Sequence, residues 1–393
     1  MNHINYRGVL LANLGSPLSP TEPDVRAYLD EFLMDPRIID LPYPLRWFIV
    51  KHTILPKRPA QSARAYQRIW SEDGSPLIAY TDRVRAKLES LLNMPVVMAM
   101  RYAQPSIRSG LASLLEQIHP GGEITLFPMY PHYAMSTYET LVLKTLTELE
   151  KLVGVKSTPD QEAQSWLRDS VRRVRWHPFF RRVGVYTLRI IPPHYDHPDY
   201  VAALVASVRS TLDVSEFDHL LFSYHGIPER HLHKTAPPGS GCLTRSCHIC
   251  ASVTPQTAET AEVNNRYAIF SQDVPNDVCY RHQVFDTTRL TARALGLHPN
   301  QYSVTFQSRL GRDEWLKPYT AEELKRLARA GVKRLAVITP SFTVDCLETL
   351  EEIGMEGRDI FLQAGGEDFR LIPCLNDNDD WVEGMAKMIT QTS

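Results

Sequence analysis

The sequence lacks the features that would assign the protein to several broad classes. Its 43 lysines and arginines are balanced by 45 aspartates and glutamates, so it carries no general basic field for nucleic acid. No apolar run approaches the roughly 18 residues that a membrane-spanning helix needs. Residues 1–16 show no basic flank followed by a long apolar core, so we expect no signal peptide. The expected location is the cytoplasm, where structural disulfides are rare.

Cysteine is also scarce, with six residues in 393, but four of the six fall between positions 242 and 279. Cys242, Cys247 and Cys250 form a C-x4-C-x2-C pattern, and Cys279 follows downstream. This spacing is typical of plant-type [2Fe–2S] ligation, and we expect such a cluster. A structural zinc site that includes His248 is an alternative. A third interpretation, unliganded thiols, is disfavoured because exposed cysteines are prone to oxidation.

Apolar runs that alternate with longer amphipathic stretches predict an α/β fold built from βαβ units with mostly parallel sheets. A hydrophobic content of 43% and a charged content of 22% are those of a globular protein. The segment 321–329 predicts an amphipathic helix. Five segments that end in turn signals predict strands: Gly8–Ala12, Glu123–Phe127, His219–Ser223, Ser303–Phe306 and Arg334–Ile338.

Two motifs recur at nearly the same spacing in the two halves of the chain. Residues 14–17 read L-G-S-P and residues 225–228 read H-G-I-P, which share the frame G-x-P. The frame P-x-aromatic-x5-E-T-L occurs at 131–141 and again at 340–350. Chance supplies one such match more easily than two in register. We therefore expect tandem copies of one Rossmann-like α/β domain.

The chain length fits two domains of ordinary size. We expect the first at 1–190, joined by a C-terminal helix at 378–393. The second is expected at 191–377, with a cysteine-containing insertion at 234–278. Because ligands of open α/β sheets bind beyond the carboxyl ends of the strands, we expect the strand-end loops of both domains to line one cleft.

A histidine lies at the end of a predicted strand, in the segment Ser223-Tyr224-His225-Gly226-Ile227-Pro228. Gly226 allows a sharp turn and Pro228 stiffens it, so the imidazole of His225 is held on a fixed mount. One interpretation is a catalytic base or metal ligand. The alternative is a histidine that is satisfied by hydrogen bonds at a domain boundary.

An acidic segment, 345–352, follows another predicted strand. Glu348 and Glu352 are four residues apart, so on a helix they share one face. Taken alone, this pattern favours a solvated helix whose first turn matches the helix dipole. A histidine and a row of carboxylates at strand ends together supply a general base, an exit route for protons, and ligands for a divalent metal.

Aromatic, polar and cationic residues follow the strand predicted at 303–306. Such a wall suits a large flat ligand that carries carboxylates. The residues concerned are Phe306, Gln307, Ser308, Arg309 and Trp315.

Seven segments spread over nearly the whole chain form a set of independent motifs. They are 10–17 (LLANLGSP), 74–77 (GSPL), 98–102 (MAMRY), 192–198 (PPHYDHP), 223–228 (SYHGIP), 306–318 and 340–352. In these motifs and in their order the chain resembles the ferrochelatases.

The resemblance implies two similar Rossmann-like domains and insertion of Fe²⁺ into a porphyrin. It implies that His225 and Glu348 lie on opposite sides of the porphyrin, with Glu352 extending the acidic track. His225 would accept protons or bind the metal first. Arg101 and Tyr102, in one matching segment, would contact the porphyrin.

Two positions bear on the substrate and on the chemistry. Family members that act on coproporphyrin tend to carry tyrosine at the position of Leu14, so leucine indicates protoporphyrin IX. Cys346 stands where animal members carry histidine, so a second imidazole base is absent although a thiol could approach the metal.

A second segment, 154–184, lengthens the chain relative to the family. Its core, residues 168–182, mixes arginines with tryptophan and phenylalanine. One interpretation is peripheral contact with an anionic inner membrane. The other is a surface excursion whose aromatic side chains pack on the domain. The oligomeric state is not predicted.

Two other functions compete with the ferrochelatase interpretation. One is a cobalt chelatase that acts on another tetrapyrrole. The other is a porphyrin- or haem-binding protein without catalysis, which would not need a proton track.

Overall fold

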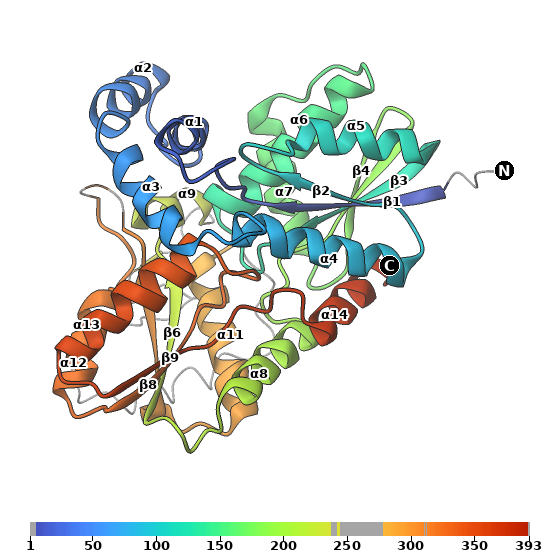
Figure 1. Cartoon of the computed structure of the whole chain (residues 1–393). Coiled ribbons are helices and arrows are strands. Elements are labelled where there is room, and N and C mark those ends of the chain that lie inside the picture. Colours follow the sequence, from blue (N-terminus) through green and yellow to red (C-terminus); the bar gives the residue numbers. More distant parts are fainter. Residues whose placement is uncertain (1–4, 237–241, 244–277, 310, 312, 392–393) are drawn as a thin grey trace. The chain divides into compact units, whose positions relative to one another are not determined.

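The computed structural model describes residues 5–236, 242–243, 278–309, 311 and 313–391, which form two compact units (Figure 1). Unit 1 comprises residues 1–130, 135–193 and 376–393. Unit 2 comprises residues 131–134 and 194–375.

Unit 1 is built on a five-stranded sheet with the order β2-β1-β3-β5-β4. All pairings are parallel except that of the edge strand β4 with β5, which is antiparallel. Val9 to Ala12 are fully buried because both faces of the sheet are covered, which explains the continuous apolar run in the sequence. The strands are β1 (Asn5–Asn13), β2 (Val96–Met100), β3 (Ile118–Pro128), β4 (Phe179–Val183) and β5 (Tyr186–Ile190).

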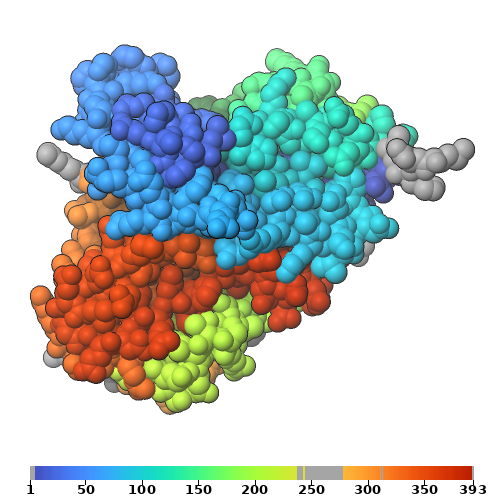
Figure 2. All heavy atoms as spheres, viewed as in Figure 1, coloured from blue at the N-terminus to red at the C-terminus, as the bar shows by residue number. Residues whose placement is uncertain are grey.

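Helices cover both faces of this sheet (Figure 1). The helices of unit 1 are α1 (Glu22–Leu33), α2 (Tyr43–Phe48), η1 (Ile49–Ile54), α3 (Arg58–Ile69), α4 (Pro76–Leu92), α5 (Ile107–Gln117), η2 (Met135–Glu139), α6 (Thr140–Leu152), α7 (Asp160–Arg173) and α14 (Asp379–Thr390). Helices α4 and α14 pack together on one face, and α5 and α6 pack together on the other. Several helices carry proline in the first turn, where no backbone N–H is needed. The segment from α1 to α3 forms the dark blue to mid-blue part of the surface in Figure 2.

Unit 2 is built on a fully parallel sheet with the order β7-β6-β8-β9. Its strands are β6 (His219–His225), β7 (Tyr302–Gln307), β8 (Arg334–Ile338) and β9 (Asp368–Leu371). In chain order, this arrangement is the same as that of the four parallel strands of unit 1, β2-β1-β3-β5. Two copies of one α/β plan, as the repeated motifs predict, are therefore present.

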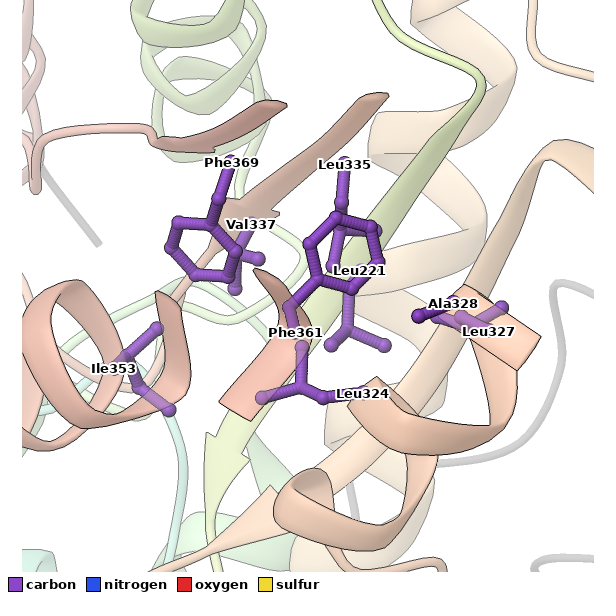
Figure 3. Close-up of a cluster of buried hydrophobic side chains, with 9 residues drawn as sticks. All are labelled: Leu221, Leu324, Leu327, Ala328, Leu335, Val337, Ile353, Phe361 and Phe369. Atoms are coloured by element: carbon purple, nitrogen blue, oxygen red, sulfur yellow. The ribbon is translucent and has the colours of Figure 1, made fainter. Parts of the chain in front are cut away.

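The helices of unit 2 also lie on both faces of the sheet. They are α8 (Pro198–Thr211), α9 (Glu229–Thr235), α11 (Tyr280–Leu295), η5 (Pro299–Gln301), α12 (Thr320–Arg329), η6 (Glu348–Gly357) and α13 (Arg358–Gln363). On one face, Leu221 of β6 joins a core of side chains from β8, β9, α12, η6 and α13 (Figure 3). Strand side chains alternate between faces, so Tyr224 points to the opposite face, where its hydroxyl is 2.8 Å from that of Thr288 in α11.

The predicted strands and the helix at 321–329 are confirmed, each inside or coincident with an observed element. The sequence did not single out β2, β4, β5 or β9, which are short. Within the described residues, no helix combines the length and the apolar character that crossing a bilayer requires.

Candidate active site

His225 is the last residue of β6, and the alternation of the strand decides which way it points. Leu221, Ser223 and His225 share one face of the sheet, and Leu221 packs in the core to which η6 contributes Ile353. Glu348 is the first residue of η6. The same face of the sheet therefore carries the histidine and the acidic helix that the sequence singled out.

The imidazole of His225 has a defined tautomer. Its Nδ1 lies 2.6 Å from the carbonyl oxygen of Gly226. A carbonyl oxygen only accepts hydrogen bonds, so Nδ1 carries the hydrogen and Nε2 carries the lone pair. The edge of the ring meets Phe342, with 6.2 Å between ring centroids. Nε2 is thus the nitrogen that can take a proton or bind a metal.

Gly226 makes the turn after His225 possible because the backbone of β7 approaches closely. A Cβ atom at this position would lie 2.8 Å from the carbonyl oxygen of Gln307 and 3.2 Å from the ring of Trp315. The amide of Gly226 donates to that same oxygen at 2.7 Å. Trp315 is buried and pairs through its backbone with Pro228, so the predicted fixed mount is present.

The acidic helix η6 has π-helical hydrogen bonding, a form found often at functional sites. The carboxylate of Glu352 accepts hydrogen bonds from the amide of Ser308 at 2.8 Å and from its hydroxyl at 2.5 Å. Burial raises the pKa of Glu352, and the carboxylate interacts electrostatically with His225 and with Glu348. The structure thus brings His225, Glu348 and Glu352 together.

The residues predicted to form the aromatic wall do not all face the same way. Gln307 pairs with His225 in the sheet and lies on its face, whereas Phe306 pairs with Tyr224 and points to the other face. Phe306 and Gln307 are buried. The side-chain amide of Gln307 accepts a hydrogen bond from the hydroxyl of Ser223 at 2.7 Å through Oε1. Its Nε2 donates to the backbone carbonyl oxygen of Glu348 at 2.9 Å.

Arg309 is exposed, and its guanidinium lies 4.8 Å from the centroid of the Tyr319 ring. Among the residues predicted to form the aromatic wall, Arg309 is the cation, and its exposure makes it accessible to an anionic ligand.

Leu14, Arg101 and Tyr102, the other predicted porphyrin contacts, belong to unit 1. Leu14 follows β1, is half-buried, and accepts a hydrogen bond from the amide of Tyr102 at 2.9 Å. Arg101 forms an ion pair with Asp35, and the Tyr102 hydroxyl donates to the same carboxylate at 2.9 Å. The polar ends of both side chains therefore contact Asp35.

Asp35 is held as an anion by these contacts. Burial alone would raise its pKa, but the Arg101 guanidinium and hydrogen bonds from Thr140, Arg37 and Tyr102 outweigh burial and lower the pKa below its ordinary value. Arg101 is thus paired with a permanent negative charge inside unit 1.

The predicted cluster ligands lie only partly within the described residues. Cys242 and Cys279 are buried, whereas Cys247 and Cys250 lie outside the described residues. Among the residues that the structure describes, no three histidine, cysteine or acidic side chains are grouped as metal ligands.

Cys346, the residue next to the acidic helix, is also buried. Burial and the neighbouring Glu348 raise the pKa of its thiol well above the ordinary value. A neutral thiol is a poor metal ligand, because the thiolate is the ligand form.

Sequence reasoning did not select two residues that contact the His225 backbone, Tyr280 and Ser341. The Tyr280 hydroxyl donates to the His225 carbonyl oxygen at 2.7 Å, and the His225 amide donates to the Ser341 hydroxyl at 3.4 Å. Ser341 lies in the repeated frame at 340–350, but that frame gives no sign of this contact. Tyr280 carried no signal of its own.

These features define a class of protein. It is an α/β protein whose strand ends present an imidazole and two carboxylates, suited to moving protons and binding a divalent metal.

Comparison with known proteins narrows this class to one family. The family model for ferrochelatases matches residues 6–166 and 161–393. Curated ferrochelatases from Pseudomonas putida and Ectopseudomonas mendocina are 42% and 43% identical to the chain. The match covers 97% of both chains for the first, and 96% of this chain and 95% of the relative for the second. A ferrochelatase from Opitutus terrae is 43% identical over 98% of this chain and 96% of its own.

Among solved structures, a multi-domain protein from Deinococcus radiodurans, described as structurally similar to chelatases, aligns with a TM-score of 0.44 and 12% identity. The alignment covers 98% of this chain and 56% of that one. The full-length matches to the family model and to the curated relatives decide the assignment. The chain belongs to the ferrochelatase family.

Proposed function

We propose that this protein is a ferrochelatase that inserts Fe²⁺ into protoporphyrin IX to form protohaem, with His225 as the base. The observation that carries the proposal is the tautomer of His225, which leaves a lone pair on Nε2. The His225 ring lies close enough to the carboxylate of Glu352 to interact with it electrostatically, and Glu352 interacts in the same way with Glu348. Full-length similarity to curated ferrochelatases supports the reaction class. Fe²⁺ and the porphyrin are both substrates.

Metal insertion requires that two pyrrole protons leave the porphyrin and that Fe²⁺ loses bound water. His225 accepts a pyrrole proton at Nε2, while its Nδ1–H bond to Gly226 keeps the ring in place. Distortion of the macrocycle exposes the nitrogen lone pairs to the metal. The fixed imidazole needs no rearrangement at this step.

Glu348 and Glu352 carry protons away and offer oxygen ligands to the hydrated metal. The raised pKa of Glu352 suits this role, because a carboxylate that titrates closer to neutral pH both takes up and releases protons readily. Ser308 holds the carboxylate in one orientation with two hydrogen bonds.

The porphyrin contacts are assigned from exposure as well as from motif. We propose that Arg309 binds a propionate, which its exposure supports, and that Trp315 stiffens the wall beside His225. Phe306 and Gln307 support the site through their buried contacts. Arg101 and Tyr102 are proposed as porphyrin contacts on the matching motif alone. Leu14 favours protoporphyrin IX over coproporphyrin.

The test is anaerobic incubation of the purified protein with Fe²⁺ and protoporphyrin IX, with haem formation followed by absorbance. We expect turnover by the parent and a loss of about 10²- to 10⁴-fold in His225→Ala. His233 is an exposed histidine in α9, so His233→Ala is the matched control and should retain the parental rate.

Two outcomes would reject the proposal. Porphyrin binding without turnover in the parent would indicate a binding protein. Turnover with Co²⁺ and another tetrapyrrole, but not with Fe²⁺ and protoporphyrin, would indicate a cobalt chelatase.

We propose that Cys242, Cys247, Cys250 and Cys279 hold a [2Fe–2S] cluster. The spacing of the four thiols supports it, and so does the burial of Cys242 and Cys279, which shields a cluster from oxidants. Iron, sulfide and zinc analysis of anaerobically purified protein tests this: equal iron and sulfide supports a cluster, and zinc alone rejects it.

Peripheral membrane contact through 154–184 is the remaining proposal, with the cytoplasmic face of the inner membrane as the location. Part of this segment is internal to unit 1: Trp166 packs on Phe179, with 5.8 Å between ring centroids. The contact surface would therefore be the exposed side chains of Arg173, Arg175 and Phe180. Flotation with anionic liposomes, compared between the parent and a variant with aspartate at these three positions, tests it; equal flotation rejects it.

A further inference from the structure

The backbone of His225 lies beyond the end of one neighbouring strand. The pairing of β6 with β8 ends at Phe222 and Ile338, whereas its pairing with β7 continues to His225 and Gln307. The amide of Gly226 points to the β7 side, where it donates to Gln307. In a parallel ladder the amide and carbonyl of His225 must then face the β8 side, where the strand has ended. Buried backbone groups without partners are costly, so something else must satisfy them.

Two side chains take the place of the missing strand. The Tyr280 hydroxyl lies 2.7 Å from the His225 carbonyl oxygen and 3.0 Å from the Ser341 hydroxyl oxygen. The Ser341 hydroxyl oxygen lies 3.4 Å from the His225 amide nitrogen. Both backbone groups of one residue are thus bound by a pair of hydroxyls that contact each other.

The direction of every hydrogen bond in this group follows from chemistry. The His225 carbonyl only accepts, so the single hydroxyl hydrogen of Tyr280 is donated to it. The Ser341 hydroxyl must then donate to the Tyr280 oxygen, and its own oxygen accepts from the His225 amide. The three bonds close into one ring in which each hydroxyl donates once and accepts once. Such closed chains strengthen each member, a cooperative effect.

The ring joins three separate elements. Tyr280 is the first residue of α11 and is buried, Ser341 lies in the turn after β8, and His225 ends β6. Phe342, next to Ser341, packs against the imidazole. Any shift of α11 or of the β8 turn is thereby transmitted to the main chain of His225.

We propose that Tyr280 and Ser341 are positioning residues that hold the main chain of His225 so that Nε2 keeps one alignment toward the substrate. The inference rests on the proposed function of His225 and adds the residues that make the base rigid. Neither residue touches the porphyrin in this mechanism. Their loss acts on the rate of the chemical step and not on substrate binding.

The experiment compares the full-length parent with Tyr280→Phe, Ser341→Ala and the double variant in the haem-forming assay. Small misplacements of reacting groups cost about tenfold to hundredfold in rate, so kcat should fall by about that factor in each single variant. KM for the porphyrin should change by less than about twofold, since uniform binding is untouched. Because either substitution opens the ring, the kcat of the double variant should be no lower than that of the more impaired single variant.

Tyr138→Phe is the matched control. Its hydroxyl is buried in unit 1 and donates to a backbone carbonyl, that of Ile191, at 2.8 Å. Removing it deletes the same kind of bond far along the chain from His225, so kcat should stay within about twofold of the parent. Equal kcat in Tyr280→Phe and Tyr138→Phe, or losses that multiply in the double variant, would overturn the inference.

A readout without turnover separates this inference from the proposed function. The ¹⁵N shifts of the His225 ring, assigned with His225→Ala, report its tautomer and its exchange between orientations. Tyr280→Phe or Ser341→Ala should broaden or shift them, and Tyr138→Phe should not. If the parent forms no haem, the proposed function fails while these spectra still decide the positioning role; unchanged spectra reject it. If Tyr280→Phe does not fold, Ser341→Ala carries the same test.

Discussion

At the scale of single residues, Ser308 controls the acid–base state of Glu352. Its backbone has a φ of +65°, and from this conformation both its amide and its hydroxyl reach one carboxylate. Burial raises the pKa of Glu352, whereas the hydrogen bonds from Ser308 lower it. The hydroxyl thus keeps part of the Glu352 population ionised at a given pH.

Ser308→Gly should therefore move the acid limb of the kcat/KM profile to higher pH. Glycine tolerates the positive φ and keeps the amide donor, so only the hydroxyl is lost. Without it the pKa of Glu352 rises further, and the ionised form needed to accept protons appears only at higher pH. The measurement is the pH dependence of haem formation.

The control is Ser215→Gly, where a serine amide and hydroxyl also donate to one carboxylate, at 2.9 and 2.8 Å, but on the exposed Asp213. Its profile should overlay that of the parent. A profile of Ser308→Gly that also overlays the parent would show that Glu352 does not limit the reaction.

The sequence predicted the important side chains of this site better than their surroundings. His225 and Glu348 stand at strand ends in recognisable motifs, so pattern alone selects them. The tautomer of His225 depends on the fold of the turn at Gly226, which the motif alone does not specify. The ring with Tyr280 and the burial of Phe306 depend on contacts between segments far apart in the chain. Strand register decides such contacts, and a single residue of register reverses which face a side chain takes.

At the scale of elements, α7 anchors a buried carboxylate. Glu139 ends η2, and its side chain is fully buried. Arg168 of α7 donates to it from Nε at 2.9 Å, and Gln164 donates at 2.5 Å. Arg37 lies 3.5 Å away and also pairs with Asp160, the first residue of α7. The segment that sequence reasoning connected with a membrane therefore has a structural role in unit 1.

Arg168→Met should lower the free energy of unfolding by about 3 kcal/mol, because it leaves a buried carboxylate short of its main partner. Urea denaturation followed by circular dichroism measures the loss. The exposed pair of Arg26 and Glu22 is the control, since Arg26→Met should cost less than about 1 kcal/mol. Restoring stability by adding Glu139→Gln would support the ion-pair explanation, and equal losses in the two arginine variants would contradict it.

The elements themselves were predictable where they are long and apolar. Buried parallel strands such as β1, β3 and β6 each contain an apolar run that ends in a turn, so composition suffices to predict them. The edge strands β4 and β9 are short and mix charged with apolar residues, which gives no clear period. The π-helical bonding of η6 was not predictable, because nothing in the residue pattern of Glu348–Gly357 distinguishes it from an ordinary α-helix.

At the scale of the whole molecule, buried histidines make stability depend on pH. Burial lowers the pKa of His219 from 6.5 to about 4 and that of His132 to about 3. The unfolded chain binds protons near pH 6.5, but the folded chain does so only near these lower values. The stability that the neutral rings contribute is therefore present above pH 6.5 and is lost as the pH falls toward 4 or 3.

Between about pH 7.5 and about pH 5, His219 alone should account for a loss of about 2 kcal/mol. His219→Gln should reduce the pH dependence of unfolding in urea by that amount, whereas the exposed His233→Gln should not change it. The same pH dependence in the parent, His219→Gln and His233→Gln would show that folding does not lower the pKa of His219.

The repeated plan of the molecule was readable from the sequence because both copies keep the same turns after equivalent strands. The strand order that the two sheets share agrees with this repeated plan. We retain 1–190 with 378–393, and 191–377, as the proposed domains. The contacts of the two acidic residues were not predictable from the sequence. Arg168 of α7 binds the carboxylate of Glu139, whereas Gln307 of β7 donates to the backbone carbonyl oxygen of Glu348.

The two copies also differ at the positions proposed for catalysis. Where the second copy has His225 the first has Leu14, and where the second has Glu348 the first has Glu139, which is neutralised by arginines. At these two positions the first copy therefore has a leucine in place of the imidazole and a carboxylate that is already bound by arginines. If His225 is the base, as proposed, we expect one reaction centre in each chain and therefore one porphyrin bound per polypeptide.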